Sequence, residues 1–186
     1  MNLSELNTDG KMLVFPEFHQ ADYYDCVASG LVSILVSNDI AVREEEVMKL
    51  AGTTKENGTD PIGVAKVLKH FKIPNKAGAM TPQKLRSAIA AGHPVLIMLQ
   101  AYRDDKKVPY EKCLDDGHCA VCIGYTGPQF IFEDPASYTR TWLNEKELLV
   151  RWHDTDASGK KFSNWGCEIL RQRPFAPHIG KLVKME

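Results

Sequence analysis

Residues 20–37 read QADYYDCVASGLVSILVS and join a polar turn to an apolar segment. The apolar residues recur on one helical face, at Val27, Leu31, Ile34 and Leu35. This spacing predicts a helix over residues 25–37, with Asp25 as its capping residue. Cys26 then stands in the first turn of that helix, where unpaired N–H groups and a partial positive charge favour a thiolate. The stretch therefore predicts both a helix and a candidate nucleophile at its start.

Four further helices are expected downstream, because each candidate segment has helical apolar spacing and a recognisable start or stop signal. A capping residue followed by proline opens two of them, at Asp60-Pro61 and at Thr81-Pro82. The expected helices cover residues 43–51, 61–71, 82–91 and 145–151.

The apolar period changes after residue 92, and strands are expected from there on. The expected strands cover residues 94–99, 118–125 and 129–133, with a weaker one at 166–171. The charged segment 103–116 is expected to be a loop. Because helices come first and antiparallel-looking strands follow, we expect a single α+β domain over residues 1–186. Its N-terminal helices would pack on a C-terminal, mostly antiparallel sheet.

The composition is that of an ordinary globular protein, with 186 residues of which 44% are hydrophobic and 25% charged. The formal net charge of −1 offers no electrostatic attraction for nucleic acid or an anionic membrane. No apolar run approaches the ~18 residues that span a bilayer, and residues 1–20 lack the apolar core of a secretory signal. Five cysteines without disulfide-like spacing favour a reduced, cytoplasmic protein.

A histidine and a carboxylate complete a candidate site around Cys26. His118 follows Gly117 and opens an expected strand, which would hold its imidazole on a rigid element. The next strand ends in Glu133-Asp134, where a carboxylate would accept the imidazole N–H and fix the orientation of the ring. Because successive strand side chains alternate faces, only one of these two carboxylates can face His118. Asp134 is the preferred orienter, and Glu133 is the alternative.

Gln20 stands six residues before Cys26 and offers a side-chain amide close to the candidate nucleophile. Together with the backbone N–H of Cys26, such an amide would stabilise the oxyanion that forms when a thiolate attacks a carbonyl. His19 and Asp22 are the nearby polar alternatives to Gln20.

The order of these residues resembles that of the bacteriocin-processing cysteine peptidases of the papain clan, which cut double-glycine leader peptides at the front of bacterial ABC exporters. The resemblance spans about residues 13–150 and rests on Gln-x5-Cys, on Gly-His opening a strand and on Asp-Pro after the next strand. It implies a papain-like fold. Cys26 would be the nucleophile, His118 the general base, Asp134 the orienter and Gln20 part of the oxyanion hole.

The resemblance implies a peptidase or related amide hydrolase that acts on a peptide or another amide substrate and needs no cofactor. The chain would be a stand-alone relative without the exporter. It departs from the family at Val27, where the family usually has glycine, and the insert at 103–116 is a candidate wall of a different cleft. Two alternatives stay open, namely an acyltransferase or transpeptidase that uses the same site, and a non-catalytic peptide-binding module. The oligomeric state is open as well.

A zinc site is a further alternative, because Cys113, His118, Cys119 and Cys122 are of the residue types that bind zinc. Residues 118–125 are expected to form a strand, however, and Cys119 and Cys122 would then point to opposite faces of it. Both cysteines are therefore expected to be core residues, and no metal is expected.

Overall fold

The segments of the N-terminal half in which apolar residues recur with helical spacing form helices, as predicted. The structure is a computed structural model that describes residues 10–156 and 158–186. Its α-helices are α1 (Cys26–Ser37), α2 (Glu44–Ala51), α3 (Pro61–His70), α4 (Pro82–Ala90) and α5 (Glu145–Arg151). All five predicted helices are confirmed to within one residue at each end. The segment predicted as a loop at 103–116 contains one short 3₁₀ helix, η2 (Tyr110–Lys112).

Side-chain caps account for three of these helix starts, and at the start of α4 the hydroxyl of Thr81 accepts a hydrogen bond from the Lys84 N–H at 3.2 Å. The carboxylate of Asp60 accepts a hydrogen bond from the Gly63 N–H at 2.9 Å at the start of α3. At the start of α5, the side chain of Asn144 and that of Glu147 each bind the backbone N–H of the other residue. These bonds satisfy N–H groups that a helix leaves unpaired at its N-terminus, so the positions of these three helices follow from local sequence.

The start of α1 differs from the prediction, because Asp25 precedes the helix but its side chain does not cap it. A carboxylate oxygen of Asp25 accepts a hydrogen bond from the backbone N–H of Asp22 at 3.0 Å instead. This bond closes the tight turn ahead of Cys26. The N–H groups in the first turn of α1 are therefore not occupied by the Asp25 side chain.

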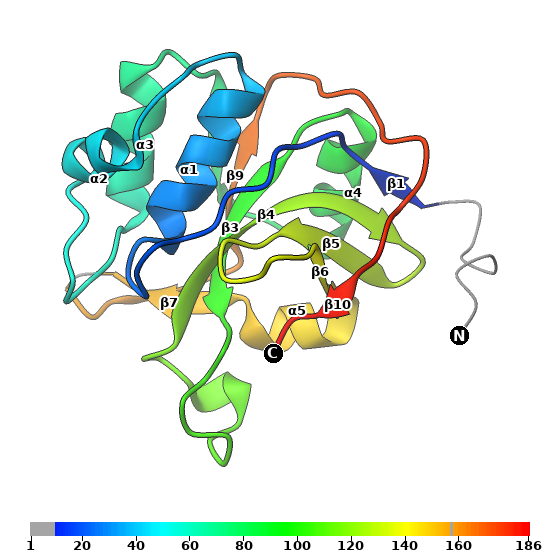
Figure 1. Ribbon diagram of the computed structural model, residues 1–186. Helices are drawn as coiled ribbons and strands as arrows, with labels where there is room; N and C mark the ends of the chain where they lie inside the picture. The colour runs from blue at the N-terminus through cyan, green and yellow to red at the C-terminus, as the bar shows by residue number, and fades with distance from the viewer. Residues whose placement is uncertain (1–9, 157) are drawn as a thin grey trace.

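The strands form one large sheet and a separate two-stranded ribbon (Figure 1). They are β1 (Lys11–Met12), β2 (Asn75–Ala79), β3 (Val95–Gln100), β4 (Gly117–Thr126), β5 (Gln129–Glu133), β6 (Thr141–Asn144), β7 (His153–Thr155), β8 (Lys161–Ser163), β9 (Trp165–Ile169) and β10 (Val183–Lys184). The order in the sheet is β10-β6-β5-β4-β3-β9-β2, with β1 on β4, and β7 pairs with β8. Every pairing is antiparallel except the parallel pair β10–β6.

The central strands β3, β4 and β5 confirm the predicted segments, and β9 confirms the weaker one. The remaining strands were not predicted. β2 has the sequence NKAGA and is exposed along most of its length, so it lacks the apolar alternation that marks a strand. β6 is only four residues long. These strands form because a neighbouring strand already offers free N–H and C=O groups, which local sequence does not reveal.

Helices cover both faces of β4 (Figure 1). On one face, Gly30 of α1 lies against the side chains of Cys119 and Val121. On the other face, α4 packs against β4, and the guanidinium of Arg86 from α4 lies 4.6 Å from the centre of the Phe130 ring in the neighbouring strand β5. α2 and α3 pack beside α1 and away from the centre of the sheet. The N-terminus of α1 therefore meets the sheet near the beginning of β4.

No helix in the described ranges 10–156 and 158–186 combines the length and the hydrophobicity that crossing a lipid bilayer requires. The prediction that residues 1–20 contain no secretory signal concerns a segment whose first nine residues lie outside the described part of the chain.

We expect Gly63→Ala to destabilise the protein, although alanine is the better helix former. A Cβ atom at residue 63 would lie 2.6 Å from the carbonyl oxygen of Ala51 and 2.6 Å from Cγ2 of Thr59. Because a backbone oxygen cannot yield without moving α2, the free energy of unfolding should fall by about 1–3 kcal/mol. Urea denaturation measures this change.

Gly30→Ala is the matched control, because it also places alanine inside a helix. A Cβ atom there would meet Sγ of Cys119 at 3.5 Å, which is an ordinary contact. The free energy of unfolding should stay unchanged or rise by up to about 1 kcal/mol. Equal losses in the two variants would contradict the close approach of α3 to α2.

Candidate active site

Cys26 is the first residue of α1 and borders a cleft. The cleft has a volume of about 460 Å³, and His118 lines it together with Cys26. The cysteine is 7% exposed, so its sulfur is screened from bulk water but open to the cleft. Its position at a helix N-terminus suits a negative charge.

The imidazole of His118 is hydrogen-bonded to the carboxylate of Asp134, with 2.8 Å between Nε2 and Oδ1. The two side chains are buried, with exposed fractions of 6% and 1%. They meet because β4 and β5 are antiparallel, with Val121 opposite Glu133, which brings the start of β4 to the end of β5. Since Asp134 engages Nε2, Nδ1 is the ring nitrogen left for Cys26.

Three donors besides His118 hold the Asp134 carboxylate. The hydroxyl of Tyr102 donates to Oδ2 at 2.6 Å, and the hydroxyl of Thr141 donates to the same oxygen at 3.0 Å. The backbone N–H of Ala136 donates to Oδ1 at 3.1 Å. Four donors on a buried carboxylate fix its orientation and favour its charged form.

Electrostatics keeps a proton on His118 at neutral pH. Burial alone would lower the pKa of His118, but the Asp134 carboxylate, together with the hydrogen bond and charge of Cys26, raises it from 6.5 to about 10. Burial would likewise raise the pKa of Asp134, but the charge of His118 and hydrogen bonds from His118 and Tyr102 hold it below its ordinary value. At neutral pH the pair is therefore an imidazolium and a carboxylate.

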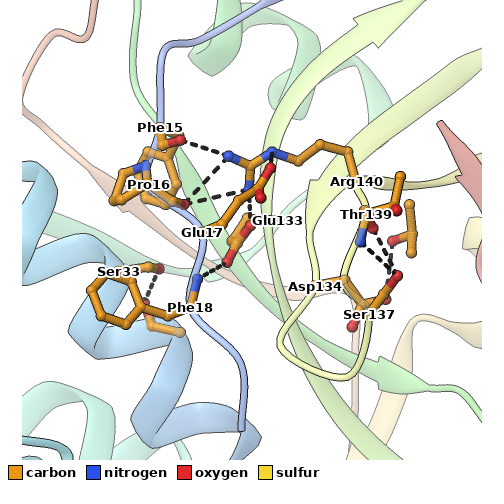
Figure 2. A network of polar contacts seen from close by, with 12 residues as sticks. Phe15, Pro16, Glu17, Phe18, Ser33, Glu133, Asp134, Ser137, Thr139 and Arg140 are labelled. Carbon is orange, nitrogen blue, oxygen red and sulfur yellow. Dashed lines mark hydrogen bonds and ion pairs between the residues drawn. The ribbon is translucent and has the colours of Figure 1, made fainter. Parts of the chain in front are cut away.

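Glu133, the alternative orienter, is engaged elsewhere (Figure 2). One of its carboxylate oxygens accepts the backbone N–H of Phe18 at 2.8 Å, and the other pairs with the guanidinium of Arg140. Arg140 also donates to the carbonyl oxygen of Phe15 at 2.6 Å. Glu133 thus ties the segment that leads to residue 20 onto the sheet, and Asp134 is the carboxylate that meets the histidine.

Gln20 is not among the residues that line the cleft next to Cys26. Its side-chain nitrogen donates to the carbonyl oxygen of Asp22 at 2.8 Å. Its backbone N–H donates to the carbonyl oxygen of Pro135 at 3.0 Å, so the residue lies directly behind the Asp134 turn. His19 and Asp22, the polar alternatives, line the same small second pocket as Gln20.

Loops that are distant in sequence form the walls of the cleft. They contribute residues 55–60, residues 154–156, and Leu114 and Asp115 from the insert at 103–116. The prediction that the insert shapes the cleft agrees with this arrangement. Sequence reasoning missed Tyr102, whose φ of 56° is unusual for an aromatic residue, as well as Thr141 and Asp154. No motif marks these three, because their roles depend on partners in other strands.

Cys119 and Cys122 lie in β4 and are fully buried, as predicted for core residues. Cys119 faces α1 at Gly30, and the Cys122 thiol lies 3.8 Å from the carbonyl oxygen of Gly124. Within residues 10–156 and 158–186, no group of three or more histidine, cysteine or acidic side chains is arranged to hold a metal ion.

Residues 12–159 match the model of a protein family described as the Peptidase_C39 like family. This range covers most of the chain and contains the four residues predicted for the site, Gln20, Cys26, His118 and Asp134. No curated protein matches the sequence.

Three solved structures share the fold. A C39-like peptidase from Bacillus anthracis has a TM-score of 0.65 and 14% identity, over 88% of this chain and 99% of that chain. The peptidase domain of Streptococcus ComA, a bifunctional ABC transporter of a quorum-sensing pathway, has a TM-score of 0.59 and 17% identity, over 87% and 97%. A double-glycine motif protease from an AMS/PCAT transporter, solved with its leader peptide, has a TM-score of 0.60 and 20% identity, over 88% and 95%. The predicted α+β, papain-like fold is thereby confirmed.

We expect Asp134→Asn to lower the pKa of His118 markedly from about 10, because burial then acts on the imidazolium without an opposing carboxylate. Ring C–H NMR signals followed against pH measure this change. His93, which pairs with Glu168 elsewhere, is the internal control. An unchanged His118 titration would contradict the proposed coupling.

The same substitution should change stability with a defined pH dependence. Because the pKa of His118 is raised in the folded protein, His118 contributes its full stabilisation below pH 6.5. This stabilisation is lost as the pH rises through about 10. Because the pKa of Asp134 is lowered in the folded protein, Asp134 stabilises the protein above pH 3.8, and this stabilisation is lost as the pH falls further. The stability difference between the wild type and Asp134→Asn should therefore be largest between pH 3.8 and 6.5.

Tyr102→Phe should lower the free energy of unfolding by about 1 kcal/mol at neutral pH, because it removes one donor from a buried carboxylate. The loss should shrink as acid protonates Asp134, since the Tyr102 hydroxyl favours the charged form. Urea denaturation at neutral and acidic pH measures both values. Tyr138→Phe, at a residue that is 85% exposed, is the control. An equal loss in the two variants would show that the hydroxyl bond contributes nothing.

Proposed function

The chain belongs to the Peptidase_C39-like family, and we propose that it is a papain-like cysteine peptidase that cleaves a peptide bond through a thioester on Cys26. One observation carries the proposal. His118 binds Asp134 with 2.8 Å between Nε2 and Oδ1, and the same imidazole lines the cleft together with Cys26, which helps to raise its pKa. A nucleophile, a proton carrier and a group that orients the carrier are the parts that thiol-dependent acyl transfer requires.

In the acylation step, the Cys26 thiolate attacks the scissile carbonyl carbon and forms a C–S bond. The imidazolium of His118 gives its Nδ1 proton to the leaving nitrogen as the C–N bond breaks, which leaves a thioester and a free amine. The pKa of His118, at about 10, keeps this proton on the ring at neutral pH until it is needed. Asp134 holds the ring in orientation and stabilises its charge.

In the deacylation step, neutral His118 takes a proton from water, and the resulting hydroxide attacks the thioester carbonyl. The C–S bond breaks, and the carboxylic acid product leaves. The proton stays on His118, so the thiolate and imidazolium are restored with water as the only co-reactant.

The oxyanion of the tetrahedral intermediate would be bound at the N-terminus of α1. The backbone N–H of Cys26 is one proposed donor, since the Asp25 side chain does not cap the helix. Gln20 is the second proposed donor. Its side-chain nitrogen donates to the carbonyl oxygen of Asp22 at 2.8 Å. On substrate binding it would break this hydrogen bond and donate to the oxyanion instead. The backbone of Gln20 is held in place by its hydrogen bond to the carbonyl oxygen of Pro135.

Val27 stands where the family usually has glycine, and its side chain is accommodated. It is 5% exposed and borders the cleft. Its bulk is therefore packed into the core, so this departure is compatible with catalysis.

We propose a reducing compartment, the cytoplasm, for this enzyme. All five cysteines are free, and a thiol nucleophile must stay reduced to act. A peptide substrate is proposed by analogy with the AMS/PCAT protease, which was solved with a leader peptide.

We expect iodoacetamide at about pH 6 to alkylate Cys26 faster than the other cysteines. Burial raises the pKa values of the Cys122 and Cys167 thiols to about 12, so these thiols stay protonated and slow. Site-resolved mass spectrometry measures each rate. His118→Ala should slow alkylation of Cys26 by about tenfold or more, because the imidazolium partner is lost. Cys26 reacting no faster than Cys122, at a rate that His118→Ala does not change, would refute the proposal.

A peptide library with mass-spectrometric detection tests turnover, with Cys26→Ala as the blank. Hydrolysis by the wild type that is absent from the blank supports the peptidase. Replacement of the acid product by an amide when an amine is added would assign the site to an acyltransferase or transpeptidase. Peptide binding with no cleavage and an unreactive Cys26 would assign the chain to a binding module.

A further inference from the structure

The cleft next to Cys26 carries an excess of negative charge. Its lining includes five carboxylates against one lysine and the imidazolium of His118, whereas the whole chain has a formal net charge of −1. The residues are Glu56, Asp60, Asp115, Asp154, Asp156 and Lys55. No basic side chain of the described residues forms an ion pair with any of these carboxylates. The negative charge is therefore concentrated in the cleft, and among its lining residues only Lys55 and His118 offset it.

Two of the other carboxylates accept hydrogen bonds that fix the local backbone. Asp60 caps α3, and one oxygen of Asp156 accepts the N–H groups of Ser158 and Lys160. Asp154 differs from these two, because the buried side chain of Gln100 holds it and its carboxylate lies against Gly117, the neighbour of His118.

The carboxylate of Asp154 is rigidly held by one of its oxygens only. Oδ1 accepts the side-chain nitrogen of Gln100 at 3.1 Å and the backbone N–H of Thr155 at 2.8 Å. Gln100 is fully buried and also binds the N–H of Asp116 at 3.1 Å, so this support cannot swing away. Oδ2 receives no donor from the residues that the structure describes and is available to a ligand in the cleft.

Asp154 lies next to the proposed chemistry. A Cβ atom built on Gly117 would stand 2.8 Å from each oxygen of the Asp154 carboxylate. Only glycine therefore lets the carboxylate reach the backbone directly before His118. Burial raises the pKa of Asp154 to about 6, although the charge of His118 opposes this effect. A bound cation would compensate this partly desolvated carboxylate.

Aromatic rings at the mouth of the cleft also suit a cation. Tyr23 and Tyr24 line the cleft, and Tyr23 is 78% exposed. The ammonium of Lys55 already lies 5.9 Å from the centre of the Tyr24 ring. Tyrosine faces and free carboxylates together are the surroundings that bind lysine and arginine side chains.

We infer that the cleft selects peptides with a lysine or arginine side chain one or two residues from the scissile bond, and that Oδ2 of Asp154 is the specificity-determining acceptor for that cation. The inference rests on the proposed function, because it takes the cleft as the substrate site. The distance from the scissile bond follows from the contact of Asp154 with Gly117, the neighbour of His118.

Binding to Cys26→Ala protein tests the inference without requiring cleavage. The probes are pools of short peptides that carry arginine or its uncharged isostere citrulline at one fixed position, with the other positions varied. Peptides retained by the immobilised protein are quantified by mass spectrometry. We expect arginine pools to be retained about tenfold or more over citrulline pools at one position or two neighbouring positions. Higher salt should reduce the difference.

Two variants in the Cys26→Ala background locate the preference. Asp154→Asn keeps an acceptor oxygen for Gln100 and Thr155, so it should fold normally, and it should abolish the arginine preference. Asp39→Asn removes the same charge from an exposed residue outside the cleft, where φ is 62°. Asparagine tolerates that conformation, so this control should keep the preference.

Equal retention of arginine and citrulline pools overturns the inference, and so does a preference that survives Asp154→Asn. The inference is also overturned if Asp154→Asn reduces the retention of arginine and citrulline pools equally. Such a result would mean that Asp154 only supports His118, because that role does not depend on the charge of the ligand. Failure of the proposed function is recognised separately, by an unreactive Cys26 in the wild-type protein.

Discussion

The hydrogen bond between His118 and Asp134 is the interaction on which the candidate site depends. It pairs an imidazolium with a carboxylate in the buried part of the protein. Either charge alone would be unfavourable there, because burial removes its hydration. The carboxylate tolerates burial because Tyr102, Thr141 and the backbone also donate to it. The histidine tolerates burial as a cation because that carboxylate is fixed. Each half of the pair is stable only in the presence of the other.

Strand geometry divides two adjacent carboxylates between two tasks. Glu133 joins Arg140 and the backbone of Phe18, and so anchors the chain before Gln20 (Figure 2). Asp134, one residue later, meets His118. Two adjacent residues at the end of β5 therefore hold two parts of the proposed site. Glu133 holds the segment that leads to Gln20, and Asp134 holds the proposed base, His118. The oppositely directed side chains of successive residues make this division possible.

Most of the regular structure was predictable because its signals are local. The cap at Asp60, the capping box at Asn144 and the apolar runs of β3 and β4 each specify an element within a few residues. Asp25 was misassigned because two local bonds compete for its side chain, and the turn to Asp22 is the one that forms. The polar edge strand β2 has no local signal at all, since only its pairing with β9 makes it a strand.

The sequence by itself determined the helices, the central strands and the order of Gln20, Cys26, His118 and Asp134. Those features follow from spacing along the chain and from capping chemistry, which act over a few residues. Only the tertiary structure decided that Asp134 and not Glu133 meets the histidine, that Tyr102 supports it, and that Asp154 stands against Gly117. These contacts join segments that lie far apart in the chain, so they exist only after the sheet has paired and buried them.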